Sequence, residues 1–564
     1  MKKIIVTLFI FIFIFLILSV QDVYAYGNTI SFDKKIGMNG HVDVPQDILS
    51  AGGVVREYHN FGWSITEDKK MYFNKYSWWD FDNYYKNLSS KGITILPCIQ
   101  MGEQSVFNRN RNEKPVIKGD DTTDPMSYKI HSNYLFNYAA RYGNTKVNEL
   151  RLNLDSKETV KTGLGYITYY EDWNEPDKTW QGPDAQFNST ELAAMLSADY
   201  DGHEGRLGDT YGIKRADPNS KLVMGGMAGG STMVTWLNEM QSWANINRTD
   251  KKLPLDVINY HQYTSTHSPE NSTFVEDAKK IIAWRDSNDK TKEIWITEFG
   301  WDTNINSTHA APSLDTQRDW IIREYLIGDR IGLDRVVVYD ALNDGPSSDT
   351  TQYSTSGLAT NSNEGFIKKS SWYGVNTAKN TLKGFKFKEV IEESNNIYIY
   401  KYENDSNEEC YVLWSPTENG RIINDYKLNV GNTSSVVKTE LKDKEELGIN
   451  TNLPVKNNEV TLSVSESPIF VKVKKEDKSD NKEDQKTDTD NDKINNDNNI
   501  RNDLKDSTQN KEDEKIVAED KNDIISQIVN IPNTTVTAVG QSIFGVQLII
   551  SAIVIIIKSL RGSF

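Results

Sequence analysis

The chain has 564 residues, which is enough for several domains and a large hydrophobic core. Its formal net charge of −16 argues against nucleic acid or an anionic surface as the main partner, because either would require a basic face. The two cysteines, Cys98 and Cys410, fall in regions that we expect to be separate domains, so a disulfide between them is the less favoured alternative.

The first 25 residues are typical of a secretory signal peptide. Lys2 and Lys3 precede an unbroken apolar run over residues 4–20, and Val23-Tyr24-Ala25 fits the small-residue rule for cleavage. A retained membrane anchor is the alternative, since the run is long for a signal. Either interpretation places the following residues outside the membrane.

Eight apolar runs of strand length recur between residues 36 and 342, with longer mixed stretches between them. This alternation of strands and helices is typical of a parallel sheet, and eight parallel strands can close into a barrel. The runs are 36–39, 53–57, 93–97, 166–171, 221–225, 256–260, 294–298 and 336–340. We therefore predict an α/β fold in which residues 26–385 form a (β/α)8 TIM barrel.

Helix signals lie between these runs, as the alternation requires. Segments 189–192 and 315–318 resemble helix starts, and we expect 371–375 to belong to the last barrel helix. Residues 100–132 are polar and irregular, which predicts a long loop after the third strand.

Residues 386–474 have a different pattern, with short alternating runs at 396–400, 409–414 and 467–473. These runs predict a small antiparallel β-sandwich beside the barrel. We expect its role to be structural, with sugar binding as the alternative.

The C-terminal part is predicted to be a spacer followed by an anchor. Residues 475–530 are rich in Lys, Asp, Glu and Asn, a composition that forms no core and predicts a disordered linker. The apolar run 536–557 is long enough to cross a bilayer of about 30 Å. Residues 531–564 also resemble a sortase signal, although Thr535 stands where the common motif has glycine. We expect attachment to the membrane or to the cell wall.

Two of the predicted barrel strands end in a glutamate. Asp172-Trp173-Asn174-Glu175-Pro176 closes the fourth run, and Thr297-Glu298-Phe299-Gly300 closes the seventh. Carboxylates at the C-terminal ends of separate strands of one barrel face each other across its mouth. Such a pair suits hydrolysis of a glycosidic bond, with one acid protonating the leaving oxygen while the other attacks or activates water.

These two motifs resemble the signatures of the clan A retaining glycoside hydrolases, whose scaffold is a (β/α)8 barrel. The resemblance covers roughly residues 36–385 and implies that Glu175 is the acid/base and Glu298 the nucleophile. It also implies that Asn174 hydrogen-bonds the sugar 2-hydroxyl and that Arg56 makes a bidentate contact with Glu298. We expect Glu175 to be protonated at the start because of the neighbouring negative charge.

A second group of residues supports the same resemblance. Tyr260-His261-Gln262-Tyr263 resembles the clan's His-x-Tyr, which implies that Tyr263 donates to Glu298 and that His261 lies near Glu175 or the substrate. Taken alone, a histidine beside two tyrosines is more often structural. Tyr339-Asp340 and the following 343–345 resemble the corresponding segment of the xylosidase- and exopolysaccharide-hydrolase-like families.

Other aromatic and polar residues follow strand ends and are candidates for lining sugar subsites, with packing as the equal alternative. They are His41, His59, Trp63, Glu103, Trp180 and Trp301. The histidines and cysteines show no His-Glu-x-x-His or Cys-x-x-Cys spacing, so we expect neither a metal nor another cofactor.

We therefore predict a monomeric, surface-tethered retaining glycoside hydrolase that cleaves β-glycosidic bonds of a polysaccharide by double displacement. One alternative is a non-catalytic glycan-binding surface protein. Another is a transglycosylase that remodels the cell's own polysaccharide with the same residues. Retention predicts carboxyl groups about 5 to 5.5 Å apart, whereas about 8 Å would indicate inversion.

Overall fold

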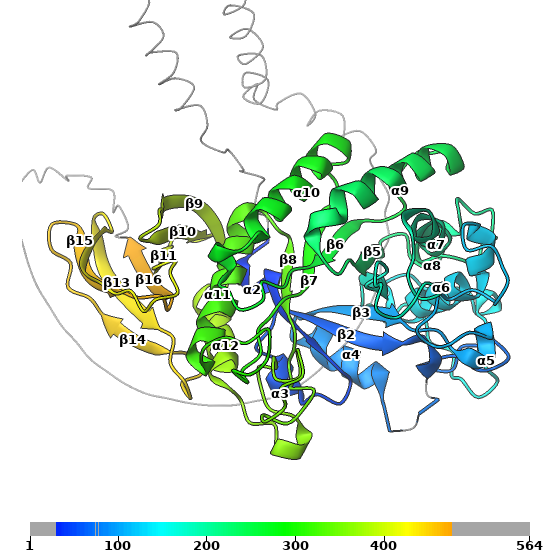
Figure 1. Ribbon diagram of the computed structural model, residues 1–564, viewed down its shortest axis with the longest axis horizontal. Helices are drawn as coiled ribbons and strands as arrows, with labels where there is room; N and C mark the ends of the chain where they lie inside the picture. Colours follow the sequence, from blue (N-terminus) through cyan, green and yellow to red (C-terminus); the bar gives the residue numbers. More distant parts are fainter. Residues whose placement is uncertain (1–29, 74, 77, 476–564) are drawn as a thin grey trace, which may run out of the picture. The chain divides into compact units, whose positions relative to one another are not determined.

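The computed structural model describes residues 30–73, 75–76 and 78–475, which belong to one compact unit (Figure 1). The expected signal peptide, the charged linker beyond Lys475 and the expected C-terminal anchor lie outside these residues. No helix in the described part of the chain is long and apolar enough to cross a membrane.

Eight parallel strands close into a barrel in the order β1 to β8, and β8 pairs with β1. The predicted closed barrel is therefore confirmed. Its strands are β1 (Ile36–Gly40), β2 (Val54–Asn60), β3 (Thr94–Gln100), β4 (Tyr169–Asn174), β5 (Lys221–Gly226), β6 (Val257–His261), β7 (Glu293–Glu298) and β8 (Arg335–Val338).

Strand β4 differs most from its predicted bounds, because it begins and ends three residues later. The backbone N–H groups of Tyr166 and Ile167 both donate to the carbonyl of Tyr142, at 2.9 and 3.1 Å. This apolar segment therefore joins the preceding helix to the strand. The shift places Asn174 in the last strand position and Glu175 directly after it.

Helices surround the barrel strands, and several short turns connect them (Figure 1). They are α2 (Phe32–Lys35), α3 (Gln46–Leu49), α4 (Phe81–Ser90), α5 (Gln104–Phe107), α6 (Lys129–Tyr142), α7 (Ser189–Asp201), α8 (Ile213–Ala216), α9 (Met233–Asn247), α10 (Phe274–Asn288), α11 (Leu314–Ile331) and α12 (Ser370–Thr381). The cap of α7 is Asn188, whose side chain accepts from the N–H of Glu191 while Glu191 bonds back to the N–H of Asn188.

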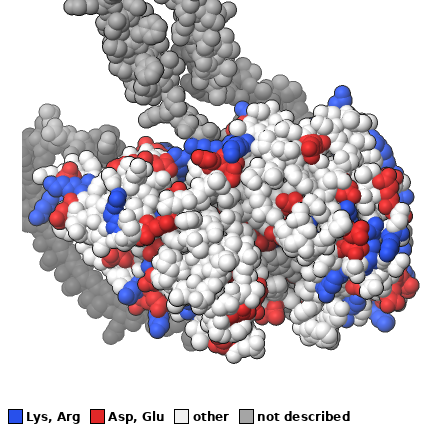
Figure 2. All heavy atoms as spheres, in the orientation of Figure 1, with Lys and Arg blue, Asp and Glu red and all other residues white. Residues whose placement is uncertain are grey.

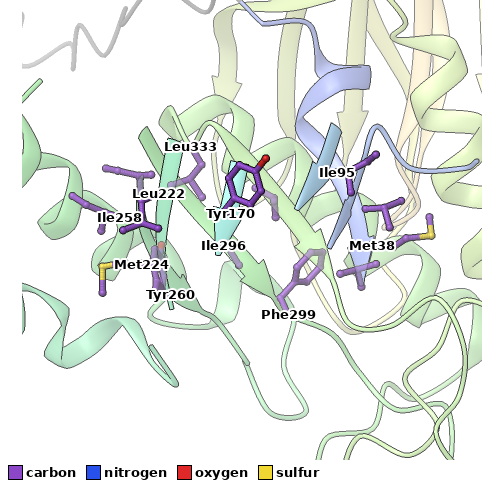
Figure 3. Packing of buried hydrophobic residues seen from close by; sticks show 14 of the residues in the cluster. Met38, Ile95, Tyr170, Leu222, Met224, Ile258, Tyr260, Ile296, Phe299 and Leu333 are labelled. Atoms are coloured by element: carbon purple, nitrogen blue, oxygen red, sulfur yellow. The ribbon is translucent and has the colours of Figure 1, made fainter. Parts of the chain in front are cut away.

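The outward side chains of the strands form the main core against the helices. Met38 of β1, Tyr170 of β4 and Ile296 of β7 belong to this shell and are fully buried (Figure 3). Because side chains alternate along a strand, every second residue points into the barrel instead. Each strand therefore contributes side chains both to the core outside the barrel and to the barrel interior.

Inside the barrel, the side chains form an apolar layer with a polar layer above it. The apolar layer, at the N-terminal end, contains Val54, Leu96, Val223, Val257, Trp295 and Val337. Two residues further along the same strands are Arg56, Cys98, Asn259 and Thr297, which are fully buried. This change from apolar to polar side chains places the charge of Arg56 just below the mouth of the barrel.

Residues 385–475 form the predicted antiparallel domain. Its six-stranded sheet has the order β14-β13-β16-β11-β10-β9, and β12 pairs with β15 in a two-stranded sheet. The strands are β9 (Phe385–Glu393), β10 (Tyr398–Asn404), β11 (Glu409–Trp414), β12 (Ile423–Asn429), β13 (Thr433–Glu440), β14 (Ile449–Asn452), β15 (Glu459–Val464) and β16 (Ile469–Lys475).

The two faces of the six-stranded sheet bury different cores. Tyr400, Tyr402 and Trp414 pack with the main core, whereas Ile399 and Leu413 pack against residues of β12 and β15. Alternation along β10 and β11 explains this division. The domain is thus joined to the barrel by a continuous apolar contact.

A buried ionic contact also joins the domain to the barrel. Arg323 of α11 donates to both oxygens of Glu270, at 2.8 and 2.6 Å, and Glu270 also accepts from the Trp414 indole at 2.7 Å. Arg323 further donates to the carbonyl of Thr417 at 3.2 Å. These contacts support the structural role expected for this domain.

We predict that Gly37→Ala destabilises the full chain by about 1 to 3 kcal/mol, because the added methyl group would overpack a strand contact. A Cβ on Gly37 would lie 2.5 Å from the carbonyl oxygen of Val54 in β2. Chemical denaturation of the two proteins measures the change in unfolding free energy. Gly229→Ala is the matched control, since its Cβ would meet no atom within 4 Å, and equal stabilities for the two variants would contradict the prediction.

Candidate active site

A cavity of about 690 Å³ opens at the C-terminal ends of the barrel strands. It is lined by His41, Tyr58, Gln100, Asn174, Glu175, Trp180, Ala228, Tyr263, Glu298, Tyr339, Asp344, Gln352 and Tyr353. Both glutamates predicted from the sequence are therefore in one cavity. The lining contains no lysine or arginine among the described residues.

Arg56 of β2 lies directly beneath this cavity and organises the polar layer. Its side chain is fully buried and makes a bidentate contact with Glu171 of β4, at 2.5 and 2.9 Å. It donates to Glu298 through Nη1 alone, at 2.7 Å. The bidentate contact expected between Arg56 and Glu298 is therefore wrong, because Glu171 occupies the fork of the guanidinium group.

Glu298 at the end of β7 accepts several hydrogen bonds. Tyr58 donates to Oε1 at 2.5 Å beside Arg56, and Tyr263 donates to Oε2 at 2.9 Å, as the sequence predicted. Burial raises the pKa of Glu298, but His261, Arg56 and Tyr58 together outweigh burial and lower it below the ordinary 4.5. The carboxylate is thus held ionised, which a nucleophile requires.

Glu175 lies in the turn directly after β4. Both Trp173 and Glu175 have positive φ angles, 81° and 46°, and the N–H of Glu175 donates to the carbonyl of Gly226 in β5 at 3.0 Å. This sharp turn directs the carboxyl group into the cavity. One carboxyl oxygen of Glu175 and one of Glu298 lie within 4.8 Å of each other.

His261 of β6 bridges the two carboxyl groups. Its Nδ1 lies 3.1 Å from Glu175 Oε1 and 3.5 Å from Glu298 Oε2. Burial lowers the pKa of His261, but the two glutamates outweigh it and raise the pKa above its usual 6.5. A proton on Nδ1 is therefore favoured; it can be donated to Glu175, while Glu298 makes an ionic contact with the same ring.

Asn174 is positioned by the same arginine. Its Oδ1 accepts from Nη2 of Arg56 at 2.7 Å, so the amide nitrogen remains as a donor toward the cavity. A donor at this place suits a sugar hydroxyl, which is the role that the sequence resemblance implied.

The remaining predicted site residues divide into two groups. Trp180, 63% exposed, lines the cavity together with Tyr339 and His41, and His41 stacks on Tyr58 with ring centres 5.3 Å apart. Trp301 does not line it. This side chain is 1% exposed, packs against Trp320 and donates to the carbonyl of His267 at 3.0 Å, so it belongs to the core.

Several functional residues were missed by the sequence analysis. Tyr58 could have been found from alternation, since it lies two residues after Arg56 on β2 and faces the same way. Glu171 lies two residues after Tyr169, which packs against the inner apolar layer, and could have been found similarly. Gln352 and Tyr353 come from the long connection after β8, where no periodicity indicates their direction.

A second cluster of possible metal ligands lies behind β4, outside the cavity. His131, Asp172 and Asp199 are fully buried, and His131 Nδ1 is 2.8 Å from Asp199 Oδ2. Two ligands of one zinc ion lie about 3.3 Å apart, so this spacing suits a hydrogen bond better. Burial and the nearby Asp199 raise the pKa of Asp172 well above its ordinary value, which favours a shared proton.

The molecular surface carries charges of both signs. Figure 2 shows acidic and basic side chains interspersed on the visible face, with wide uncharged areas between them. The cavity itself combines carboxylates with tyrosine, asparagine and glutamine side chains. Its chemistry therefore suits a polar ligand without negative charge.

The chain resembles solved glycoside hydrolases in fold. It matches a family 39 glycoside hydrolase from the gut symbiont Bacteroides cellulosilyticus WH2 with a TM-score of 0.57 and 17% identity, over 79% of this chain and 82% of that one. It matches a family 30 xylanase C from Talaromyces cellulolyticus with a TM-score of 0.50 and 14% identity, over 79% and 97%. No family model and no curated protein matches the chain. At these identities the likeness establishes the fold, a closed (β/α)8 barrel with an antiparallel sheet domain.

Proposed function

We propose that this protein is a retaining β-glycosidase that hydrolyses a polysaccharide by double displacement, with Glu298 as nucleophile and Glu175 as acid/base. The observation that carries the proposal is the approach of the two carboxyl groups to within 4.8 Å. Retaining enzymes bring their carboxyl groups to about 5 to 5.5 Å, whereas inverting enzymes need about 6.5 to 9.5 Å to admit water.

In the first step, Glu298 attacks the anomeric carbon while protonated Glu175 gives its proton to the leaving oxygen. The contacts from Arg56, Tyr58 and Tyr263 keep Glu298 ionised until that bond forms. Asn174 donates to the sugar 2-hydroxyl, a bond that strengthens as positive charge develops on the ring. The leaving group departs with the proton, and a glycosyl ester remains on Glu298.

In the second step, water attacks the same carbon and Glu175 removes its proton. Glu175 gave its proton to the leaving group in the first step, so it can accept one here. His261 contacts both carboxyl groups and can hold its Nδ1 proton toward whichever carries the charge. The sugar leaves with its original configuration.

A neutral sugar unit fits the cavity best. Its lining combines tyrosines and Trp180 with amide groups and carboxylates, and offers no lysine or arginine for a uronic acid. The complete set of acid, nucleophile and supporting donors favours catalysis over the non-catalytic binding alternative. Transglycosylation would use the same groups, and product analysis separates it from hydrolysis.

We also propose that the enzyme acts at the cell surface. The support comes from the sequence: an apolar run at residues 4–20 and another at 536–557, each beside basic residues. Cell fractionation, with detection of the barrel in membrane, wall and soluble fractions, tests this location.

Glu298→Gln is expected to lower kcat/KM for aryl β-glycosides and polysaccharides at least about 1,000-fold, because the amide cannot form the glycosyl ester. Screening β-glucans, xylans, mannans and bacterial exopolysaccharides identifies the substrate first. Glu276→Gln, an exposed glutamate of α10, is the control and should retain full activity. Full activity in Glu298→Gln would contradict the assignment of Glu298 as the nucleophile.

Glu175→Gln is expected to lose about 10²- to 10⁴-fold on substrates with poor leaving groups, since the acid step is lost. Added azide should restore turnover of an activated aryl glycoside and give a β-glycosyl azide, because the covalent intermediate still forms. Proton NMR of the product reports its configuration. An α-azide, or no rescue with an otherwise folded protein, would contradict the acid/base role.

Tyr58→Phe is expected to move the acidic limb of the kcat/KM profile to higher pH. The lowered pKa of Glu298 means that activity is present above that pKa and is lost as the pH falls through it. Removal of one donor to Glu298 makes its pKa less depressed. Tyr353→Phe, which lines the same cavity and is not among the described donors to Glu298, is the control. Identical acidic limbs in wild type and Tyr58→Phe would refute the role of Tyr58.

A further inference from the structure

A second hollow of about 420 Å³ lies on the loops that follow β2 and β3. Its lining includes none of the residues that contact Glu175 or Glu298. The lining residues are Asn60, Gly62, Trp63, Tyr76, Gly102, Glu103, Gln104, Asn110 and Arg111. The mechanism described above leaves this hollow without a role.

The hollow adjoins the catalytic cavity. Asn60 and Gln100 are the last residues of β2 and β3 and are paired in register. Gln100 lines the catalytic cavity, Asn60 lines the hollow, and the Gln100 amide donates to Asn60 Oδ1 at 3.2 Å. These two side chains therefore form a common wall between the two spaces.

The lining has the chemistry of a site for a neutral sugar. Trp63 and Tyr76 supply apolar ring surface, while Asn60, Gln104 and Asn110 supply both donors and acceptors. Glu103 and Arg111 have opposite charges, so the lining carries no net charge. An anionic ligand would need an excess of basic groups, and a purely apolar ligand would leave these amides unpaired.

The hollow is also held in shape by its surroundings. Lys75 donates to the carbonyls of Gly62 and Ile65, at 2.9 and 2.8 Å, which fixes the turn that carries Trp63. The Trp63 ring packs against Trp79 with centres 4.5 Å apart. A Cβ on Gly62 would lie 2.3 Å from Glu103 Oε2, so glycine lets this carboxylate lie close to the turn. A rigid aromatic surface loses little conformational entropy on binding.

We propose that this hollow is a distal subsite for a further neutral pyranose unit of the same polysaccharide whose bond is cleaved between Glu175 and Glu298. This inference rests on the proposed glycosidase function. A glycan that occupies both spaces extends beyond the catalytic cavity, so the enzyme cuts within chains and favours long substrates over short ones.

The test compares a long substrate with a short one. Trp63→Ala should lower kcat/KM for the polysaccharide about ten-fold relative to kcat/KM for an aryl β-glycoside, which is too short to reach the hollow. The double variant Gln104→Ala/Arg111→Ala should lower the same ratio and alters only exposed side chains. Ile246→Ala is the control, because Ile246 of α9 is 82% exposed and lies outside the lining. It should keep the wild-type ratio.

A binding measurement makes the test independent of turnover. In the Glu298→Gln background, calorimetry with cello-, xylo- and manno-hexaoses should show tighter binding than with the corresponding disaccharides. Trp63→Ala and the double variant should each remove that advantage. Unchanged ratios and unchanged hexaose binding in both variants would overturn the subsite. If the wild-type enzyme does not hydrolyse aryl β-glycosides, the glycosidase proposal is overturned instead. Hexaose binding would still decide whether the subsite exists.

Discussion

The structure of the site depends on one buried cation. Arg56 is fully buried inside the barrel, where an unpaired charge would be very costly, and the partners that follow come from strands β1, β4 and β7. Glu171 neutralises it through two parallel hydrogen bonds, Asn39 and Asn174 accept from it, and Glu298 receives one further bond. Glu298, the proposed nucleophile, is thus positioned by an interaction that also stabilises the barrel interior.

This arrangement explains why the polar layer lies where it does. The strand alternation that places Val54 and Leu96 in the apolar layer places Arg56 and Cys98 one repeat nearer the mouth. A charge at the lower level would have no route to the substrate, and a charge at the rim would be screened by water. One repeat below the mouth, Arg56 remains desolvated and still reaches both Glu298 and Asn174.

Much of the fold could be predicted from the sequence, because it follows from local signals. Eight apolar runs with helical stretches between them were enough for a closed barrel, and the strand-end motifs located Glu175 and Glu298. The bounds of β4 were not predictable in this way, since Tyr166 and Ile167 are as apolar as a strand but hydrogen-bond to Tyr142.

Within the site, what could be predicted came from the resemblance of the strand-end motifs to those of the clan. Tyr263 was predicted to donate to Glu298 and does so. Trp301 follows a strand end in the same way, yet the chain turns it into the core against Trp320. The partner of the Arg56 fork was missed because Glu298 and Glu171 are both carboxylates of barrel strands. Only the three-dimensional spacing decides between them.

The position of β16 in its sheet has a mechanical consequence. This strand is the last described segment and lies between β13 and β11, with antiparallel hydrogen bonds on both sides. Tension applied to the chain beyond Lys475 would act along the strand axis and load both ladders in shear at once. An edge strand would resist the same load through one ladder alone, so this arrangement lets the sheet resist pulling from its C-terminal side.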